Sequence, residues 1–242
     1  MKLKKHIIFF VAICFAVGLF AQRSRSPIMN NPYYDTKPYH FGFLLGSNLM
    51  DFRIQTVDDY KELSNDSLLG VRSSGQLGFT VGIVSNLKLH EFWDLRFVPT
   101  ISFGARRMNY LLQETPDFIT LVPKGVESTT VDFPLEVKWK GMRDGSLRPY
   151  VIGGFRYGLD MASNAKKKEQ NLDEVIIKLK KNDLTFTTGV GFDFYIPYGN
   201  KIALEIKMGF GINDLLVREN NIFTNGIQRL TSRNLQIAIT FE

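Results

Sequence analysis

Charged side chains of both signs stand at every second position in several segments that are otherwise rich in apolar residues and glycine. Such spacing puts the charges on one face of a β-strand, where they can form ion pairs or relay protons. An unpaired ion in a confined interior is costly, so we interpret these residues as a structural network of ion pairs, with conduction or proton relay as the alternative. The residues of this predicted lumen network are Arg96, Asp132, Glu136, Lys138, Arg156, Asp193, Glu205 and Lys207.

Catalytic chemistry has few candidate residues. Beyond residue 21 the histidines are His40 and His90, and neither has further ligands at the spacing of a metal site. A lipid-modifying barrel enzyme needs a histidine with a serine or an acid at the membrane rim, and Ser47 and Ser85 are the serines that we consider for this role. We interpret both histidines as ordinary rim residues. The sequence therefore predicts no enzyme activity, no metal and no cofactor.

The first 21 residues have the pattern of a secretory signal peptide. Three lysines precede an apolar run at 7–20, and Ala21 offers a cleavage point. The run is too short for a membrane-spanning helix. It contains the one cysteine, Cys14, so we expect an exported protein without a disulfide. Cleavage of the signal peptide removes its three lysines and lowers the formal charge from +6 to +3. This weak basicity does not indicate a nucleic-acid partner.

Apolar and polar residues alternate in eight segments after the signal peptide. Alternation of this length is typical of a tilted membrane strand, and no segment has the uninterrupted apolar run of a transmembrane helix. We predict an all-β fold, an eight-stranded antiparallel transmembrane β-barrel, with the large apolar face toward lipid and the charged, glycine-rich face in the lumen. The segments are 39–49, 77–89, 94–106, 131–139, 151–160, 184–194, 202–213 and 234–241.

The connections between these segments separate a membrane barrel from a soluble sandwich. Those near His90, at 141–147 and at 197–200 are short, whereas those at about 54–74, 107–128, 161–182 and 214–232 are long. Strict alternation of short and long connections is typical of outer-membrane barrels, which have short periplasmic turns and long external loops. A sandwich with Greek-key crossings has no reason to produce it. We therefore predict a signal peptide at 1–21, a periplasmic lead-in at 22–37 and an outer-membrane barrel at 38–242.

Two segments outside the predicted strands have the composition of contact surfaces. The lead-in is rich in Asn, Pro and Ser, so we expect no regular structure there. Tyr33, Tyr34 and Tyr39 are expected at the membrane–water interface. The loop at 161–182 is basic and could attract lipopolysaccharide phosphates or an acidic partner, although a solvated loop explains the same composition. The residues predicted to contact a partner are Tyr33, Tyr34, Asp35, Lys37, Pro38, Lys166, Lys167 and Lys168.

The segment at 34–43, Tyr-Asp-Thr-Lys-Pro-Tyr-His-Phe-Gly-Phe, resembles the PorT family of Bacteroidetes. Further likeness lies at 95–99, 132–138 and 148–154, in elements that many small barrels of that phylum share. The resemblance implies an outer-membrane component of the type IX secretion system, which exports proteins that carry a C-terminal signal domain. It implies a non-enzymatic role in assembling or stabilising the export machinery, and it carries over no catalytic residue.

Two other functions remain open at this stage. A general small barrel could stabilise the surface or bind a ligand through its external loops, and a lipid-modifying barrel enzyme is the third hypothesis. The expected partners are outer-membrane lipid and lipopolysaccharide, with other secretion proteins if the resemblance holds, and no nucleic acid.

Overall fold

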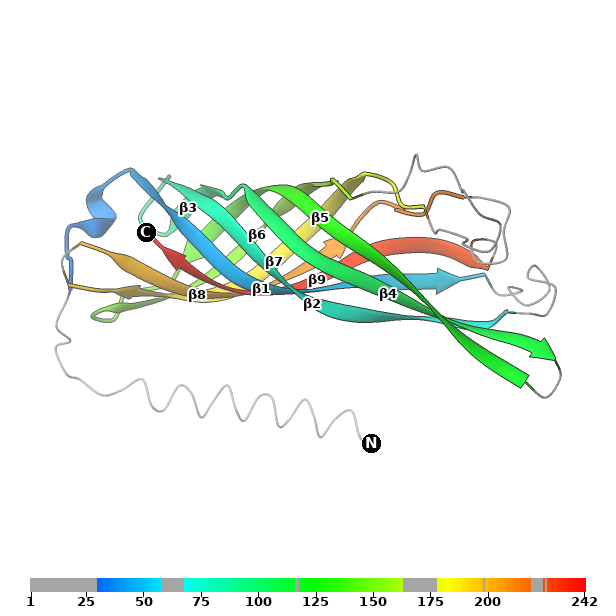
Figure 1. Cartoon of the computed structure of the whole chain (residues 1–242). Helices are drawn as coiled ribbons and strands as arrows, with labels where there is room; N and C mark the ends of the chain where they lie inside the picture. Colours follow the sequence, from blue (N-terminus) through cyan, green and yellow to red (C-terminus); the bar gives the residue numbers. More distant parts are fainter. Residues whose placement is uncertain are drawn as a thin grey trace, which may run out of the picture.

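The protein is a closed antiparallel barrel in which both described ends of the chain lie at the same end (Figure 1). This computed structural model describes residues 30–57, 68–115, 118–162, 178–197, 199–218, 224 and 226–242. The predicted signal peptide, residues 22–29 and the lysines at 166–168 lie outside these ranges. Within them, no helix is both long and apolar enough to cross a membrane. The strands are β1 (Tyr39–Thr56), β2 (Leu68–Lys88), β3 (Trp93–Phe97), β4 (Thr100–Thr115), β5 (Phe118–Lys140), β6 (Leu147–Asp160), β7 (Asn182–Tyr195), β8 (Lys201–Gly211) and β9 (Ile227–Phe241).

The ring closes because β1 pairs with β9 on one side and with β2 on the other. β3 and β4 both lie between β2 and β5, so together they make one barrel strand that is interrupted at Val98 and Pro99. Proline has no N–H to donate, but its carbonyl accepts a hydrogen bond from the Ile83 N–H at 3.0 Å. The predicted eight-stranded antiparallel barrel is thereby confirmed, with a break in its third strand that the alternation did not show.

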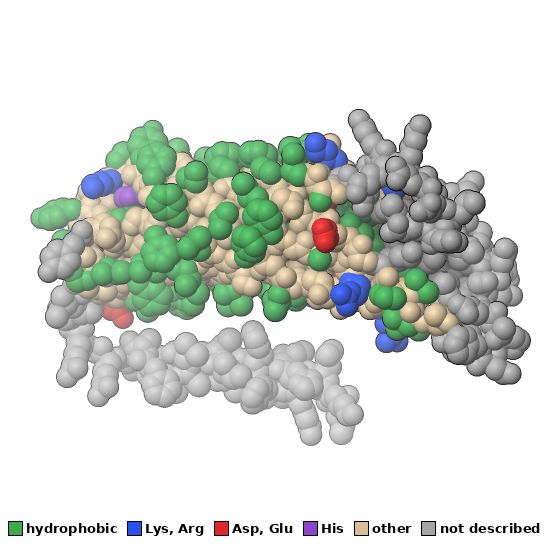
Figure 2. All heavy atoms as spheres, in the orientation of Figure 1, with side chains coloured by type: hydrophobic (Ala, Val, Ile, Leu, Met, Phe, Trp, Pro, Cys, Tyr) green, Lys and Arg blue, Asp and Glu red, His purple; other side chains and the backbone are tan. Residues whose placement is uncertain are grey.

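The apolar face of the strands points outward over the whole circumference of the barrel. Along β6 and β7, buried and exposed residues alternate, as the pleat of a strand requires. Large apolar side chains are left exposed, such as Phe43 at 66% and Phe155 at 57%. Figure 2 shows this band on one face, and its extent far exceeds the apolar patches of soluble proteins. The outer surface therefore matches a hydrocarbon environment.

Three of the predicted long loops are shorter than expected. The one predicted at 214–232 is shortened because β9 already begins at Ile227. β1 continues to Thr56 and β2 begins at Leu68, so the connection there is shorter than the predicted 54–74. The prediction of a loop at 107–128 was wrong, because β4 and β5 stay paired up to Thr115 and Phe118. Outside the bilayer the outward face of a strand meets water and no longer needs apolar side chains. A strand can therefore continue there without the alternation that identifies it.

The outer end of the lumen is closed by a cluster of apolar side chains that faces inward. It joins strand residues to the described parts of the connections after β6 and β8, at 178–181 and 212–218. Backbone hydrogen bonds hold these parts, such as that from Leu215 N–H to Leu230 C=O, 2.8 Å. Burial of this apolar surface stabilises the connections against the barrel. We call this cluster the external cap: Phe52, Met108, Tyr110, Val126, Leu179, Leu215, Leu216, Ile227 and Leu230.

Neighbouring glycines in β6 give a test of the tight inner face. A Cβ at Gly154 would overlap the Leu135 carbonyl oxygen and lie 2.7 Å from the Cα of Glu136, whereas a Cβ at Gly153 meets nothing within 4 Å. We expect Gly154→Ala to lower the free energy of unfolding by about 1–3 kcal/mol and Gly153→Ala to leave it nearly unchanged. Urea unfolding in lipid vesicles, followed by fluorescence of the two tryptophans, measures both. Equal effects would contradict this account of the inner face.

Candidate functional site: the ion-paired lumen and its periplasmic latch

The lumen is filled by charged side chains of both signs that are almost entirely removed from solvent. Among the described residues, eight cations and eight carboxylates lie there, so the interior is close to neutral. Confined charges have to be compensated in this way, since an uncompensated buried ion is strongly destabilising. The cations are Arg96, Arg106, Lys138, Lys140, Arg148, Arg156, Lys201 and Lys207, and the carboxylates are Asp94, Asp132, Glu136, Asp160, Asp183, Asp193, Glu205 and Glu242.

Glu205 stands at the centre of this network. Its Oε1 accepts hydrogen bonds from Arg96 Nη1 at 2.5 Å and from the Tyr150 hydroxyl at 2.9 Å, while Lys207 Nζ lies 3.0 Å from Oε2. Lys207 also contacts Glu136 at 3.1 Å. These residues come from β3, β5, β6 and β8, so this one cluster spans the interior and ties opposite walls together.

Toward the periplasmic end the pairs continue without interruption. Lys138 Nζ donates to both carboxylate oxygens of Asp193 at 2.8 Å and lies 3.7 Å from the centre of the Tyr150 ring. Lys201 Nζ lies 2.7 Å from Glu242 and 3.9 Å from Asp193. All four charged side chains are 3% exposed or less, so each depends on its partner for compensation.

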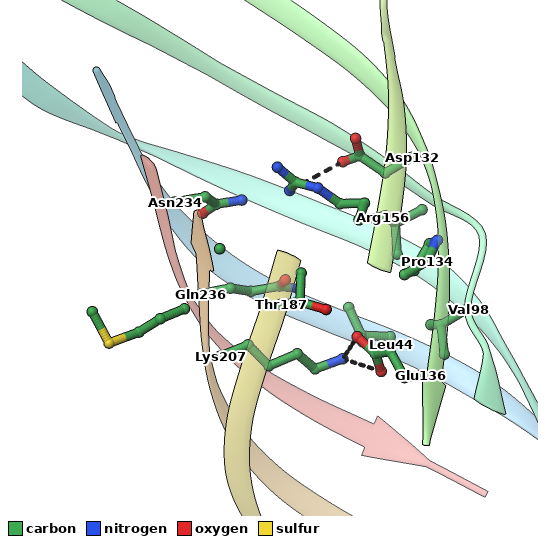
Figure 3. Close-up of a pocket in the computed structure, with 13 residues that line it drawn as sticks. Leu44, Val98, Asp132, Pro134, Glu136, Arg156, Thr187, Lys207, Asn234 and Gln236 are labelled. Carbon is green, nitrogen blue, oxygen red and sulfur yellow. Dashed lines mark hydrogen bonds and ion pairs between the residues drawn. The ribbon is translucent and has the colours of Figure 1, made fainter. Parts of the chain in front are cut away.

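Toward the outer end the contacts are longer. Arg156 lies 3.8 Å from Asp132 and 3.9 Å from Asp183. Figure 3 shows the space between this group and the Lys207–Glu136 pair, a cavity of about 20 Å³. Such a volume holds about one water molecule. Ion passage along the described lumen would require these side chains to separate.

The structure places all eight residues of the predicted network in the lumen and joins each to an opposite charge. The prediction left out the other eight lumen charges. Most stand at the same alternate positions, one or two steps toward or beyond the ends of the predicted segments. Asp94 and Lys140, which pair at 2.6 Å, are examples. Continuing the alternation past the apolar segments would have found them.

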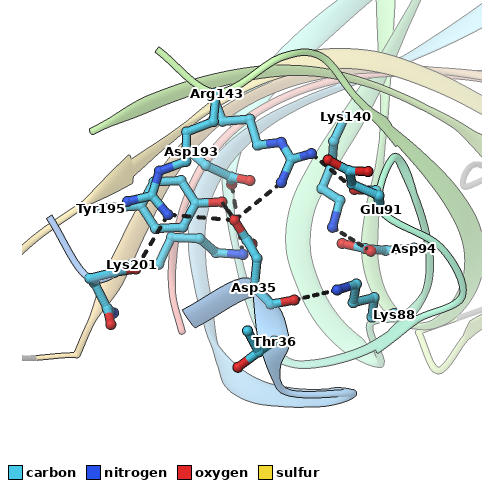
Figure 4. Close-up of polar contacts among 12 residues, drawn as sticks. Asp35, Thr36, Lys88, Glu91, Asp94, Lys140, Arg143, Asp193, Tyr195 and Lys201 are labelled. Carbon is cyan, nitrogen blue, oxygen red and sulfur yellow. Dashed lines mark hydrogen bonds and ion pairs between the residues drawn. The ribbon is translucent and has the colours of Figure 1, made fainter. Parts of the chain in front are cut away.

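The described part of the lead-in, residues 30–37, lies at the periplasmic mouth, where Figure 4 shows Asp35 pointing toward side chains of the barrel. Its short 3-10 helix, η1 (Tyr34–Thr36), brings Asp35 against donors from the periplasmic ends of β6 and β7 and from the β5–β6 turn. The Asp35 carboxylate accepts hydrogen bonds from Arg148 Nη1 at 3.1 Å and from the Tyr195 hydroxyl at 3.0 Å, with Arg143 Nη1 at 3.5 Å. We call η1 with these contacts the latch. The expectation of no regular structure in the lead-in was wrong at 34–36, where these donors fix the helix in place.

The electrostatics of the latch favour the docked form. Burial raises the pKa of Asp35, but the positive charge of Arg148 and the hydrogen bond from Tyr195 outweigh it, and the pKa lies below its ordinary value of 3.8. A lowered pKa means that the folded state holds the ionised carboxylate more strongly than the unfolded chain does. The latch is therefore stabilised above the ordinary pKa of an aspartate.

Tyr34 inserts into the mouth. Its ring stacks on His40 with centroids 4.2 Å apart and meets the edge of Tyr195 at 5.6 Å. The side chain is 6% exposed, so the expectation that Tyr34 lies at the membrane interface was wrong, whereas Tyr33 and Tyr39 are exposed at 76% and 61%. The aromatic stack offers the Tyr34 ring more buried contact than the interface would.

The residues predicted for partner contact divide into two groups. Tyr34 and Asp35 already have partners within the chain, so they could reach another protein only if the latch opened. Tyr33, Lys37 and Pro38 are exposed at the same end of the barrel. Lys166, Lys167 and Lys168 lie outside the described residues.

The candidate catalytic residues do not come together. His40 is buried under the latch on the inner face of β1, whereas Ser47 is on the lipid-facing side and donates to the Gly78 carbonyl at 3.2 Å. His90 is exposed in the turn between β2 and β3. In the part of the chain that the structure describes, no group of three or more His, Cys, Asp or Glu residues could hold a metal ion.

A ring of eight antiparallel strands with an apolar exterior, an ion-paired interior and short turns at one end defines a small β-barrel of the bacterial outer membrane. The chain belongs to the family described as outer membrane protein beta-barrel domain, whose pattern matches residues 20–217.

Solved structures of similar fold share little sequence with the chain. Neisserial surface protein A is 10% identical at a TM-score of 0.41, with 84% of this chain and 98% of that chain covered. OprG from Pseudomonas aeruginosa is 10% identical at a TM-score of 0.45, with 89% and 96% covered. Ail of Yersinia pestis, solved with a heparin analogue, is 10% identical at a TM-score of 0.36, with 85% and 98% covered. No curated protein matches the chain.

Loss of the central carboxylate tests the network. Glu205→Ala leaves Arg96 and Lys207 without a shared partner in a dry interior, so we expect a loss of about 3–5 kcal/mol in unfolding free energy. Glu127→Ala removes an exposed carboxylate of β5 and is expected to change stability by about 0.5 kcal/mol or less. Urea titration in vesicles compares the two, and a small loss in both would show that the network carries little stability.

The latch has a pH dependence of defined sign. Since the pKa of Asp35 is lowered from 3.8, docking should be constant above about pH 4 and weaken as the pH falls through the lowered pKa. In Asp35→Asn the lead-in should be undocked already at pH 7, whereas Asp144→Asn, in an adjacent exposed turn, should behave as wild type. NMR signals of the Tyr34, Thr36 and Lys37 amides, which are hydrogen-bonded in the latch, report the docked state. Docked signals in Asp35→Asn would refute the role of the ion pair.

Proposed function

We propose that this protein is a sealed, non-enzymatic barrel that acts through contacts at its surfaces, as a component that assembles or stabilises type IX export machinery. The observation that carries the proposal is the filled lumen, which has a water-sized cavity of about 20 Å³ between its charge clusters, the latch at one end and the external cap at the other. A barrel that is closed at both ends favours a role outside the lumen.

The periplasmic end offers the surface for such contacts. A cleft of about 530 Å³ lies beside the latch, and its lining includes Glu91, Phe92, Met142 and Arg143. Met142 is 82% exposed and lies, like Tyr33, at the water-exposed end of the barrel. Apolar side chains in a polar rim are typical of a protein contact site. These features support a partner on the periplasmic side.

The assignment to type IX secretion rests on the sequence resemblance at 34–43. The latch gives this segment a physical reason for its pattern: Tyr34 stacks on His40, and Asp35 binds Arg148 and Tyr195. The segment therefore shapes the periplasmic end on which we place the partner. In this view its residues present the docking surface, and Tyr33, Lys37 and Pro38 are the ones exposed to contact it.

A second function is a surface-stabilising or adhesive barrel. The long β4–β5 hairpin favours it, because the hairpin extends past the external ends of the other described strands and exposes Leu121 at 56% (Figure 1). The third hypothesis, a lipid-modifying enzyme, has no supporting geometry in the described residues, since His40 and Ser47 face opposite sides of β1.

Export in a strain that lacks this gene tests the proposal. We expect proteins with the type IX C-terminal signal to accumulate in the periplasm and the intact gene to restore their export. The double variant Tyr33→Ser, Met142→Ser should fold but restore export poorly, whereas Leu121→Ser, which removes an exposed apolar residue at the other end, should restore it fully. Normal export without the gene would refute the secretion role. A surface-binding defect in Leu121→Ser would then favour the adhesive function.

A further inference from the structure

Four arginines mark the outer edge of the lipid-facing band on one side of the barrel. Arg233 lies on β9, Arg53 on β1, Arg72 on β2 and Arg107 on β4, and all four are exposed. These strands are adjacent in the ring, so the side chains share one surface. We call them the arginine patch. Figure 2 shows basic side chains, with an acidic one among them, on the face where the hydrophobic band ends.

The strand pairing places the four arginines within reach of one ligand. Arg53 pairs with Thr231, two residues from Arg233, so the two arginines are diagonal neighbours on β1 and β9. In the same way Arg72 pairs with Asn109, two residues from Arg107. Four adjacent strands span roughly 14 Å, which is the size of a lipid head group with more than one phosphate.

The hydroxyl of Ser73 joins the two halves of the patch. It donates to the Asp51 carboxylate and accepts from the Phe52 N–H at 3.1 Å, so the backbone beside Arg72 lies against β1 at the level of Arg53. This bond fixes the relative height of the two strands where their regular pairing has ended at Met50.

The positive charge of the patch is compensated only in part, unlike that of the lumen. Among the described residues, none of the four arginines forms an ion pair, whereas Arg96 and Arg156 in the lumen do. The nearest acids in the sheet are Asp51 and Glu127. Asp51 stands directly opposite Arg233, and its Oδ1 accepts bonds from Ser73 and from the Phe52 N–H; Glu127 lies diagonal to Arg107 on β5. Four arginines beside these two carboxylates leave an excess of positive charge. Like charges at neighbouring positions of a sheet repel one another. An external anion that bridges the arginines removes this repulsion.

The level of the arginine patch relative to the lipid bilayer indicates which anion it binds. Further toward the periplasm the outward residues of these strands become apolar, such as Leu235 on β9 and Leu77 on β2, after Asp51 on β1 and Ser74 on β2. The arginines therefore lie near the level at which hydrocarbon gives way to head groups. On the other side of the barrel the exposed apolar surface continues to Met161, Leu184 and Ile212. Guanidinium groups bind phosphate through two parallel hydrogen bonds, and basic clusters at this level of a membrane bind lipid head groups.

We propose that the arginine patch binds the phosphate groups of lipopolysaccharide in the outer leaflet. The sequence suggested attraction of lipopolysaccharide for the basic loop at 161–182, whereas the described residues place unpaired arginines on β9, β1, β2 and β4. This binding does not depend on the secretion role. It holds the barrel in a fixed orientation toward the lipids around it, with one side anchored to phosphates and the other in contact with acyl chains alone.

Binding to purified lipid A tests the proposal on the full-length folded barrel. Wild type in phosphatidylethanolamine vesicles should enrich diphosphorylated lipid A over lipid A from which both phosphates have been removed. The variant Arg53→Gln, Arg72→Gln, Arg107→Gln, Arg233→Gln should lose this preference, with binding weaker by roughly tenfold or more.

A control removes the same charge elsewhere. Replacing the exposed Lys37, Lys180, Lys181 and Arg218 by glutamine should leave the preference intact. Equal loss in the control, or no preference for phosphate in wild type, would overturn the proposal. If the fourfold variant does not fold, two double variants replace it: Arg53→Gln with Arg233→Gln, and Arg72→Gln with Arg107→Gln. Each double variant must weaken binding of the phosphorylated lipid. The proposal would also be overturned if the patch bound a sulfated saccharide or a protein and showed no preference for the phosphorylated lipid A.

Discussion

The structure depends on the compensation of charge in a lumen that is filled by side chains. The Glu205 carboxylate lies 2.5 Å from Arg96, 3.0 Å from Lys207 and 2.9 Å from the Tyr150 hydroxyl. These three side chains belong to different strands, β3, β8 and β6. An ion taken out of water has to be stabilised by fixed partners, and here the partners can meet only if the barrel closes in the right register. The charged residues of the inner face are therefore compensated only when the sheet closes into the barrel.

The two ends of the lumen are closed by different physical means. At the outer end, apolar side chains such as Phe52 and Leu216 exclude water from the mouth. At the periplasmic end a carboxylate, two guanidinium groups and stacked aromatic rings hold the lead-in in place. The apolar closure does not depend on pH, whereas the latch depends on an ionised Asp35. Only the periplasmic closure can therefore respond to protonation or to a competing carboxylate.

Sequence reasoning worked wherever one face of a strand meets lipid. Apolar side chains have to alternate there, so the strands, their faces and the lumen charges such as Lys138 and Asp193 follow from the pattern. It failed beyond the bilayer, where β4 and β5 continue through a segment predicted to be a loop, because water imposes no alternation on the outer face. It also failed for Tyr34, since nothing in a segment rich in Asn and Pro shows that its ring has a buried partner in His40.

The sequence by itself determined which residues face lipid, which face the lumen and how the chain crosses the membrane, because these properties depend on neighbours two positions away. Only the tertiary structure decided which charges pair, since Arg96 and Glu205 are separated by 109 residues and Arg148 and Asp35 by 113. The arginine patch likewise exists only because closure sets β9 beside β1. Partners so distant in the chain are selected by the register and curvature of the closed ring, which no local pattern encodes.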